Sequence, residues 1–377
     1  MEARRKTLVR ATLAMVGTII GAGVFAIPAA MKGVGILTGS VIYWLLALVM
    51  LASHLEYVEV ILSDAAMRRM RLPGHAQKVL GPWAGRLALI THPLQIMGAS
   101  LAYLILGGQF LSSLASRVGL PNGELGWQLI FFACGAVTVY IGLKFVARVE
   151  NKLTWVLVGL LVVCAGLFAA HADGSLFWTP GNLSVLAPVG VFLFALSGLP
   201  AISEVVEIAG RDRRISPVAV AAGTLGAAFL MWLFGVFAYA ASGSGLGTNA
   251  MDLANGLPSS VAWLIPAVGF LAVASCFIVL TEDLKAMLHL DIRLPKPVAW
   301  AIALGGPLIL LLFVTRDFLG TVSFVGSIFG ALNGLLVSFM AIRILSNVKA
   351  RFAWRVIFPC LTAAVFLAVL IWRILII

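Results

Sequence analysis

The sequence predicts an all-α integral membrane protein with eleven transmembrane helices. Hydrophobic residues make up 62% of the 377 residues and charged residues 11%, with a mean hydropathy of +1.07. Charged residues are roughly a quarter of a soluble globular chain. The apolar residues cluster in segments of about 20 residues, the length that crosses a bilayer as a helix. The chain is therefore expected to form a single transmembrane domain over residues 1–377.

Eleven apolar segments have the required length, and each is expected to form one span. No cleavable signal peptide is expected, because the basic start MEARRKTLVR leads into a full-length span without a small-residue cleavage site. The four cysteines lie in apolar segments at no metal-ligand spacing, so no disulfide, metal site or cofactor is expected. The expected spans cover about residues 10–33, 36–62, 86–115, 126–146, 153–171, 186–209, 217–241, 259–281, 297–314, 319–342 and 355–376.

The basic residues predict the orientation. With the N-terminus in the cytoplasm, 22 of the Lys and Arg residues fall in inside segments and 4 in outside segments. Cytoplasmic loops of membrane proteins are typically enriched in Lys and Arg. If the number of spans were wrong by one, every later loop would change sides and the bias would be lost. We therefore expect a multi-pass protein of the cytoplasmic (inner) membrane with its C-terminus outside. The net charge of +11 is explained by this topology, so a nucleic-acid partner is not expected.

Glycine and proline interrupt two of the spans. The first reads GTIIGAGVFAIP over residues 17–28, and the sixth reads LAPVGVFLFALSGLPAI over residues 186–202. These spans are five apart, so they occupy matching places in two successive five-helix units, the second inverted. Paired interruptions of this kind indicate a transporter binding site at the middle of the membrane. The alternative for the first span is close helix packing through small residues, and the second interruption makes that alternative less favourable.

An interrupted helix suits an amino acid zwitterion. The N-terminus of one half-helix offers N–H groups to a carboxylate, and the C-terminus of the other offers carbonyl groups to an ammonium. The expected function is therefore secondary active transport of an amino acid through alternating access. An enzyme is not expected, because His54, Glu56 and Glu59 in the second span form no HExxH pattern. A non-transporting sensor or a channel on the same fold is the alternative, because a fold alone does not settle function.

Three motifs resemble the amino acid–polyamine–organocation superfamily. GTIIGAGVFAIPAAMKGVG is similar to its first helix, LAPVGVFLFALSGLPAI to its sixth, and EVVEIAGRDRRISPVAV to the loop that follows. Within the superfamily, the chain most resembles bacterial aromatic amino acid permeases and the amino acid–auxin permeases. The resemblance implies the leucine-transporter fold of two inverted five-helix repeats plus one extra helix. The implied repeats cover about residues 8–171 and 186–345, with the extra helix at about 355–376.

The resemblance also implies the substrate site. Backbone N–H groups of the first helix would bind the substrate carboxylate, and groups near both interruptions would hold the rest of the zwitterion. Phe194 would close the site from one side. Tyr103 would form a side-chain wall, although a lipid-interface aromatic is the alternative for this residue. The implied substrate-binding residues are Thr18, Ile19, Gly21, Ala22, Gly23, Tyr103, Phe194, Ala195, Ser197 and Gly198.

The coupling ion is expected to be a proton rather than sodium. In sodium-coupled relatives an ion lies between the first and eighth helices, and this match gives Gly17, Ile20, Ala272, Ser275 and Cys276. A possible Na⁺ would thus contact Gly17, Ile20 and Ser275, but thiol sulfur at Cys276 is a poor ligand for a hard cation. Carboxylates inside spans are candidates for proton exchange. For Glu56 and Glu204, proton exchange and a structural salt bridge are equally expected. Glu59 and Glu207 are expected to form salt bridges.

Overall fold

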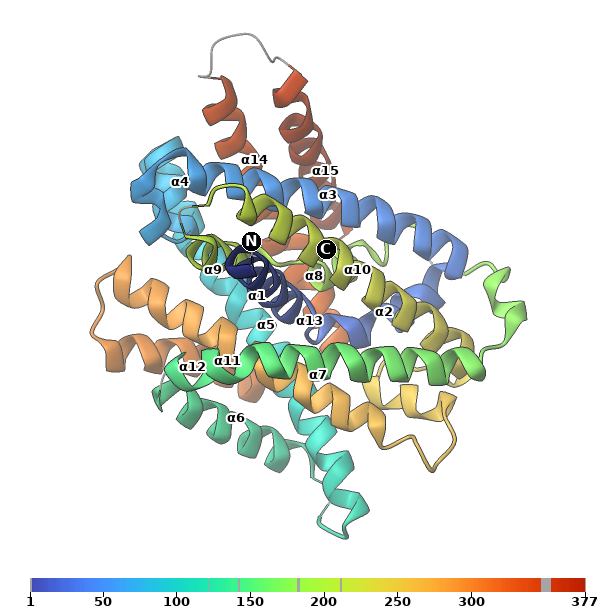
Figure 1. Ribbon diagram of the computed structural model, residues 1–377. Helices are drawn as coiled ribbons and strands as arrows, with labels where there is room; N and C mark the ends of the chain where they lie inside the picture. Colours follow the sequence, from blue (N-terminus) through green and yellow to red (C-terminus); the bar gives the residue numbers. More distant parts are fainter. Residues whose placement is uncertain are drawn as a thin grey trace.

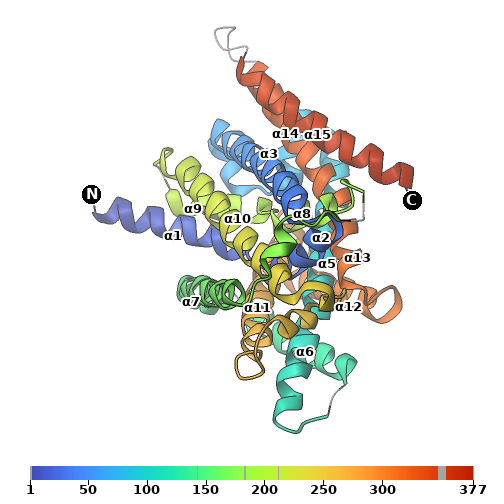
Figure 2. The ribbon, with the colours of Figure 1, turned by 90° about the vertical axis from the view of Figure 1, so that its right-hand side faces the viewer.

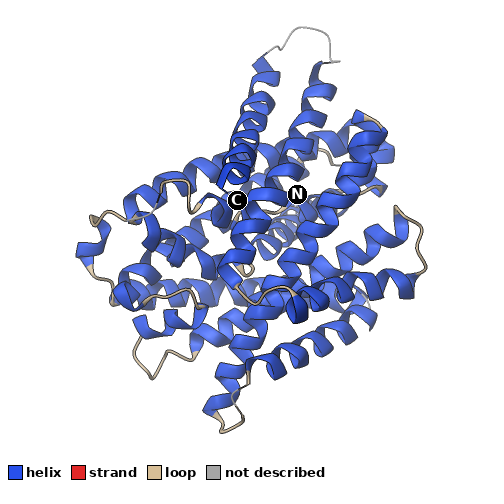
Figure 3. Cartoon of the chain, turned by 180° about the vertical axis from the view of Figure 1, so that it is seen from behind, coloured by secondary structure: helices blue, strands red, loops and turns tan. Residues whose placement is uncertain are grey.

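The computed structural model describes residues 2–121, 123–141, 143–181, 184–210, 212–346 and 354–376. Helices and loops account for these residues, and none of them is in a strand (Figure 3). Ten of the described helices are long and apolar enough to cross a membrane, and the bent pair α1–α2 supplies an eleventh span. The prediction of an all-α protein with eleven spans is confirmed.

The first five spans end at Ala170, before residue 186, where the second repeat is predicted to begin. Helix α5 contains 36 residues and runs obliquely through the bundle (Figure 1). The five spans are α1 (Glu2–Ile19) with α2 (Gly23–Val34), α3 (Ile36–Ser63), α5 (Pro82–Arg117), α6 (Glu124–Ile141) and α7 (Leu143–Ala170).

Six further spans follow, and the last two, α14 and α15, lie side by side (Figures 1 and 2). These spans are α8 (Val189–Ala195) with α9 (Leu199–Ala209), α10 (Ile215–Ser242), α11 (Leu264–Leu290), α12 (Lys296–Phe313), α13 (Phe318–Phe324) with α14 (Ala331–Ser346), and α15 (Trp354–Ile376). The short elements are α4 (Leu72–Leu80), the 3₁₀ turns η1 (Ala65–Arg69), η2 (Gly174–Phe177), η3 (Gly243–Gly245) and η4 (Ala250–Gly256), and the π turn η5 (Val325–Gly330).

Several helices extend further than the apolar segments that predict them, among them α1, which begins at Glu2 rather than at 10. Helix α11 begins at Leu264 rather than at 259 and continues to Leu290 rather than stopping at 281. Pro266 lies in its first turn, where the missing N–H has no helical partner to lose. Helix α7 begins at Leu143 rather than 153. Hydropathy marks only the part of a helix that lies in hydrocarbon, so charged extensions of this kind are missed.

Local sequence explains how α4 joins α5. Gly81 has a φ of +100°, a left-handed conformation that favours glycine, and its N–H closes α4 by donating to the carbonyl of Gln77. Pro82 then begins α5, and proline is preferred at the first position of a helix. A one-residue turn therefore fixes the short helix α4 against the start of α5.

Several charged loops meet at one end of the bundle, which we call the basic end. It holds the start of α1, the segment 64–81, the loop 210–214 and the end of α11. The same loops carry most of the basic residues predicted to face the cytoplasm, although Arg211, Lys349 and Arg351 lie outside the described residues. Three contacts join these segments: Arg4 Nε to Asp212 Oδ2 at 3.0 Å, Arg68 Nη1 to Gly210 O at 2.5 Å, and Arg213 Nη2 to Leu62 O at 2.8 Å.

The tenth span contains a π turn beside the sixth span. Helix α8 packs on η5, and the Gly326 backbone lies against the carbonyl of Gly190 and the amide of Phe194. A side chain at Gly326 would collide with this backbone, so only glycine permits the approach. Single π turns within α-helices occur frequently at functional sites. Here the turn lies directly against the half-helix that precedes the second interruption.

Candidate functional site

The two interrupted spans meet near the middle of the bundle (Figures 1 and 2). Helix α1 ends at Ile19 and α2 begins at Gly23, with a bend of 56° between them. In the sixth span, α8 ends at Ala195 and α9 begins at Leu199. A Cβ atom built on Gly23 would lie 2.5 Å from the Cα of Ala195, so the two interruptions are in direct contact.

Backbone groups are freed at both interruptions. The N–H of Gly21 donates to the carbonyl of Ile19 at 3.0 Å, which breaks the helical i to i−4 pattern. Among the described residues, the N–H of Ala22 has no backbone acceptor. At the second interruption, the N–H of Gly198 donates to Nε2 of His54 at 3.1 Å. A side chain of α3 thus accepts from one backbone N–H of the second interruption. At the first interruption, the Ala22 N–H remains available to a ligand.

The bond from Gly198 also fixes the tautomer of His54. Since Nε2 accepts a hydrogen bond, the proton lies on Nδ1, which donates to the hydroxyl of Thr224 at 3.0 Å. The imidazole is fully buried. His54 is therefore a neutral, fully bonded group that caps the start of α9.

A narrow cavity of about 30 Å³ lies beside the interruptions. Its walls are mostly apolar and also include hydroxyl groups and one amide side chain. Four residues of the predicted substrate site line it: Thr18, Tyr103, Phe194 and Ser197. Five further residues complete the lining: Gln95, Ile96, Ala99, Pro200 and Leu280.

The other predicted substrate residues are buried around this cavity without lining it. Gly21 is the best placed, since a Cβ built on it would lie 2.9 Å from the Tyr103 hydroxyl and 3.0 Å from the Cys276 sulfur. A side chain at Gly198 would meet Ile19, so these two pack the interruptions together. The buried set is Ile19, Gly21, Ala22, Gly23, Ala195 and Gly198.

Gln95 is the main polar group of the cavity, and the sequence interpretation did not include it. Its Nε2 donates to the Ser197 hydroxyl at 3.3 Å, and its Oε1 accepts from Asn333 Nδ2 at 2.6 Å. Asn333 Oδ1 in turn accepts from the Thr91 hydroxyl at 2.6 Å. A buried polar chain thus runs from α14 through α5 to the second interruption. A glutamine within a long apolar span is the signal that identifies it.

The predicted ion-coupling residues of α1 and α11 lie together. The Cys276 sulfur lies 3.2 Å from the carbonyl oxygen of Gly17 and 3.4 Å from that of Ile20. Ser275 Oγ donates to the carbonyl of Ala272 at 3.0 Å. A thiol is a weak hydrogen-bond donor. Cys276 therefore faces carbonyl groups of the first interruption from the position where the resemblance places an ion.

Glu56 lies away from the cavity, between α3 and the last two spans. Its two carboxyl oxygens accept from the Ser338 hydroxyl at 2.9 Å and the Thr362 hydroxyl at 2.8 Å. Interhelical hydrogen bonds of this kind hold helices together in membranes, so Glu56 ties α14 and α15 to α3. Glu204 is partly buried on α9 and does not line the cavity either.

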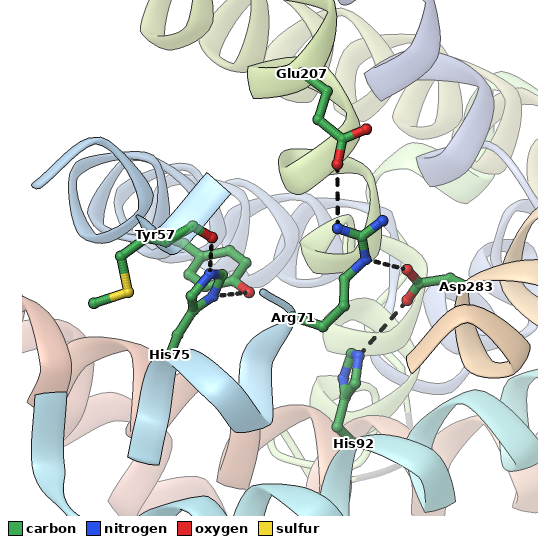
Figure 4. Close-up of polar contacts among 7 residues, drawn as sticks. Tyr57, Arg71, His75, His92, Glu207 and Asp283 are labelled. Atoms are coloured by element: carbon green, nitrogen blue, oxygen red, sulfur yellow. Dashed lines mark hydrogen bonds and ion pairs between the residues drawn. The ribbon is translucent and has the colours of Figure 1, made fainter. Parts of the chain in front are cut away.

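A second polar cluster lies at the basic end (Figure 4). Arg71 precedes α4 and is directed between two helices, with Nε 3.1 Å from Asp283 Oδ1 and Nη1 3.3 Å from Glu207 Oε1. His92 of α5 lies on the other side of Asp283, with Nε2 3.7 Å from Oδ2. The salt bridge predicted for Glu207 is confirmed. Through it, Arg71 joins the sixth span to the eighth.

His75 of α4 lies beside this cluster and is held on both sides. Its Nδ1 is 2.8 Å from the Tyr57 hydroxyl, and its Nε2 is 2.8 Å from the carbonyl of Met67 (Figure 4). The carbonyl can only accept, so Nε2 carries the proton and Nδ1 accepts from tyrosine. Burial lowers the pKa of His75 to about 4, and nearby positive charge from Arg71 and Lys78 adds to the effect.

We expect stability to fall as pH is lowered because of His75. Between pH 6.5, its ordinary pKa, and about 4, the unfolded chain binds more protons than the folded protein. The stabilisation that comes from neutral His75 is fully present above pH 6.5 and is lost as the pH falls to about 4. At about 1.4 kcal/mol per pKa unit, the loss in free energy of unfolding is up to roughly 3 kcal/mol. His75→Gln keeps a donor and an acceptor but does not titrate. Thermal unfolding in detergent should show a smaller loss from pH 6.5 to 4 in this variant, and equal losses would contradict the assignment.

A wider pocket of about 630 Å³ opens at the opposite end of the bundle. The end of α2, the 3₁₀ turns η2 and η3, and the start of the tenth span form its walls. Lys32 lies in it, with Nζ donating to the carbonyl of Leu246 at 2.5 Å. Tyr239, Thr179 and Thr248 add further polar groups. The protein thus has a narrow central cavity and a wide opening at one end.

Known proteins resemble this chain in sequence and in structure. The putrescine transporter PotE of Haemophilus influenzae is 22% identical over 233 residues, which are 59% of this chain and 52% of the relative. The chain therefore spans about half the length of that curated relative. MhsT in complex with L-phenylalanine has a TM-score of 0.69 at 18% identity, over 96% of this chain and 98% of that chain.

A second solved structure agrees. Mhp1, a nucleobase-cation-symport-1 family transporter in a closed conformation with bromovinylhydantoin bound, has a TM-score of 0.62 at 16% identity, over 97% of this chain and 90% of that chain. These likenesses confirm the leucine-transporter-type fold class. The model of the tryptophan/tyrosine permease family matches residues 4–377. Because that match covers almost the whole chain, this protein belongs to the tryptophan/tyrosine permease family.

Proposed function

We propose that this protein is a secondary active transporter that carries an aromatic amino acid across a membrane. The observation that carries the proposal is the contact of two interrupted helices beside a mostly apolar cavity that contains one amide side chain. Paired half-helices supply groups for both ends of a zwitterion. Membership of the tryptophan/tyrosine permease family supports the substrate class.

The substrate is proposed to bind across both interruptions. Its carboxylate meets the N–H groups of Gly21, Ala22 and Gly23, of which the Ala22 N–H has no backbone acceptor among the described residues. Its ammonium group meets Thr18 and the carbonyls of the sixth span. The side chain lies among the apolar residues of α5 and α11, where Gln95 accepts from an indole N–H or a phenol O–H. The sixth-span residues proposed for the ammonium group are Phe194, Ala195 and Ser197.

Binding requires the walls of the cavity to move. A volume of about 30 Å³ is far below the roughly 300–1,000 Å³ of small-molecule sites. We therefore infer a closed arrangement of this site, with the wide opening near Lys32 on one side and the Arg71 cluster on the other. Rocking of one helix bundle against the other would enlarge the cavity toward each face in turn.

The membrane placement belongs to the same proposal. We assign the basic end to the cytoplasm and the Lys32 pocket to the outside of a cytoplasmic (inner) membrane, with the C-terminus outside. The inverted repeats are proposed at about residues 8–171 and 186–345, with α15 as the extra helix. Arg71 and Lys32 then mark opposite sides of the site.

Proton coupling is proposed in preference to sodium coupling. The Cys276 thiol serves as a weak donor to carbonyl groups that would otherwise contact a cation. A hard cation prefers oxygen ligands, and Cys276 puts sulfur in their place. A neutral donor in this position satisfies the carbonyls without an ion.

Uptake is expected to be independent of sodium. Replacing Na⁺ by choline should change the uptake rate of the wild-type protein by less than about twofold, since no ion has to bind at Cys276. Cys276→Ser keeps a donor and should retain uptake, whereas Cys276→Ala leaves the Gly17 and Ile20 carbonyls without it and should lower uptake severalfold. Cys164→Ala is the matched control, as Cys164 is a buried cysteine of α7. A strict Na⁺ requirement in the wild type would contradict this prediction.

Substrate binding tests the proposal without any gradient. Labelled tryptophan should bind the purified protein saturably, and unlabelled tyrosine or phenylalanine should displace it. Leucine and lysine should displace it at least tenfold less well, because neither fills an aromatic site with a polar group at its end. Equal displacement by leucine would overturn the substrate class, and the absence of binding by every amino acid would overturn the function.

A further inference from the structure

A buried histidine and aspartate lie about one helical turn from the central cavity. His92 precedes the cavity residue Gln95 by three positions on α5, and Asp283 follows the cavity residue Leu280 by three positions on α11. An α-helix advances about 5.4 Å in one turn. Helix α5 runs away from the basic end and α11 runs toward it, so both displacements point to the basic end. The pair therefore lies between the cavity and the proposed cytoplasmic face.

The pair has unused hydrogen-bonding capacity. The side chains of His92 and Asp283 are 4% and 12% exposed, and Nε2 and Oδ2 are 3.7 Å apart. That separation exceeds the 2.7–3.2 Å of an N–H···O hydrogen bond. Neither His92 Nδ1 nor Asp283 Oδ2 has a hydrogen-bond partner among the described residues. Buried polar atoms are nearly always bonded, so this exception needs a reason.

Charged and titratable groups surround the pair. Arg71 lies between the carboxylates of Asp283 and Glu207, and Asp291 follows at the end of α11. The Asp283 carboxylate thus lies between a guanidinium and an imidazole, so a change at His92 can be transmitted to Arg71. The titratable and charged groups that face the pair are Arg71, His75 and Lys78 from the segment around α4, Tyr57 from α3, Glu207 from α9 and Asp291 at the end of α11.

We propose that His92 and Asp283 form the site that takes up the coupling proton, and that Arg71 links this site to opening of the path at the basic end. The inference rests on the proposed proton-coupled transport. One proton binds the neutral imidazole, and both ring nitrogens of the imidazolium then carry hydrogen. Its Nε2–H donates to Asp283 Oδ2 after the side chains close the remaining gap.

The added proton acts on Arg71 through Asp283. The Asp283 carboxylate now shares its charge between the imidazolium and the guanidinium, so its attraction for Arg71 weakens. Arg71 holds α9 to α11 through Glu207 and Asp283 (Figure 4). Loosening it lets the sixth span move away from the eighth and exposes His92 to the cytoplasm. The proton then leaves to water, His92 returns to its neutral form, and the Arg71–Asp283 pair closes again.

His92→Gln tests the proposal in proteoliposomes. The wild-type protein should accumulate labelled tryptophan under an inside-alkaline pH gradient. The variant should lose at least tenfold of this accumulation but keep counterflow exchange at equal pH, which needs no net proton movement. His171→Gln is the matched control, since His171 is exposed just after α7 and its Nδ1 lies 2.9 Å from the carbonyl oxygen of Leu167; it should behave as the wild type. A His92→Gln protein with wild-type accumulation would overturn the proposal.

A second pair of variants decides the matter if His92→Gln does not fold. Asp283→Glu keeps the carboxylate and should retain pH-driven accumulation, whereas Asp283→Asn should lose it while keeping counterflow. Equal accumulation in both would overturn the proposal. A pH dye in weakly buffered detergent should also report proton uptake on tryptophan binding by the wild type and not by Asp283→Asn. Failure of the wild type to bind or exchange tryptophan would instead overturn the proposed function, so the two failures are distinguishable.

Discussion

Replacing Gly23 with valine is expected to abolish uptake while the protein still inserts into the membrane. The added Cβ would lie 2.5 Å from Cα of Ala195, which is backbone and cannot turn aside as a side chain can. The two interruptions would have to separate, and the backbone N–H groups proposed for the carboxylate would move with them. We expect a loss of uptake of at least tenfold, or about 1.4 kcal/mol of the barrier, measured as the initial rate of labelled tryptophan uptake.

A matched glycine controls for the effect of the substitution itself. Gly159 lies on the exposed face of α7, where an added Cβ meets nothing within 4 Å. Gly159→Val should therefore retain uptake, and both variants should elute as the same monodisperse species in detergent. Wild-type uptake by Gly23→Val would show that the interruptions serve only packing and would remove the proposed binding site.

Gln95→Leu is expected to have the second large effect. It removes the donor to Ser197 and leaves the Asn333 Nδ2 without its acceptor. An unsatisfied buried polar group costs about 1–3 kcal/mol. A lost hydrogen bond to the substrate also disfavours the ligand that makes it. We expect the affinity for tryptophan to fall at least tenfold, more than that for phenylalanine, which has no ring N–H or O–H to offer.

The selectivity between these two ligands is the informative measurement. Gln109→Leu is the control, because Gln109 lies on the same helix and its Oε1 has no hydrogen-bond partner among the described residues. It should leave both affinities within about twofold of the wild type. Equal losses for tryptophan and phenylalanine in Gln95→Leu would show that Gln95 supports the cavity structurally and does not contact the ring.

The spans and interruptions were predictable because each depends on local composition. Hydropathy marks a helix wherever about 20 apolar residues occur together, and Gly17–Pro28 carries its own helix-breaking residues. Hydropathy does not predict the helix ends that lie outside the hydrocarbon, as in α11, because the residues there are charged and lower the mean hydropathy even though they are helical. Thr18, Tyr103, Phe194 and Ser197 were assigned by resemblance and do line the cavity.

The polar partners were less predictable because they come from distant parts of the chain. Gln95 bonds to Ser197 and Asn333, which are 102 and 238 positions away. The sequence does not single out Asp283, because it lies just beyond the apolar segment expected to end at 281. Only the packing of α5 against α11 shows that it faces His92. The coupling role predicted for Glu56 and Glu204 stays a prediction.

Accumulation of labelled tryptophan in proteoliposomes tests the central claim most directly. With an inside-alkaline pH gradient and no sodium, the internal concentration should rise above the external one and should return to equilibrium when a protonophore is added. Gly23→Val in the same assay should give only the background of empty liposomes. A correctly inserted wild-type protein that accumulated neither tryptophan, tyrosine nor phenylalanine under a proton gradient or a sodium gradient would contradict its assignment as an aromatic amino acid transporter.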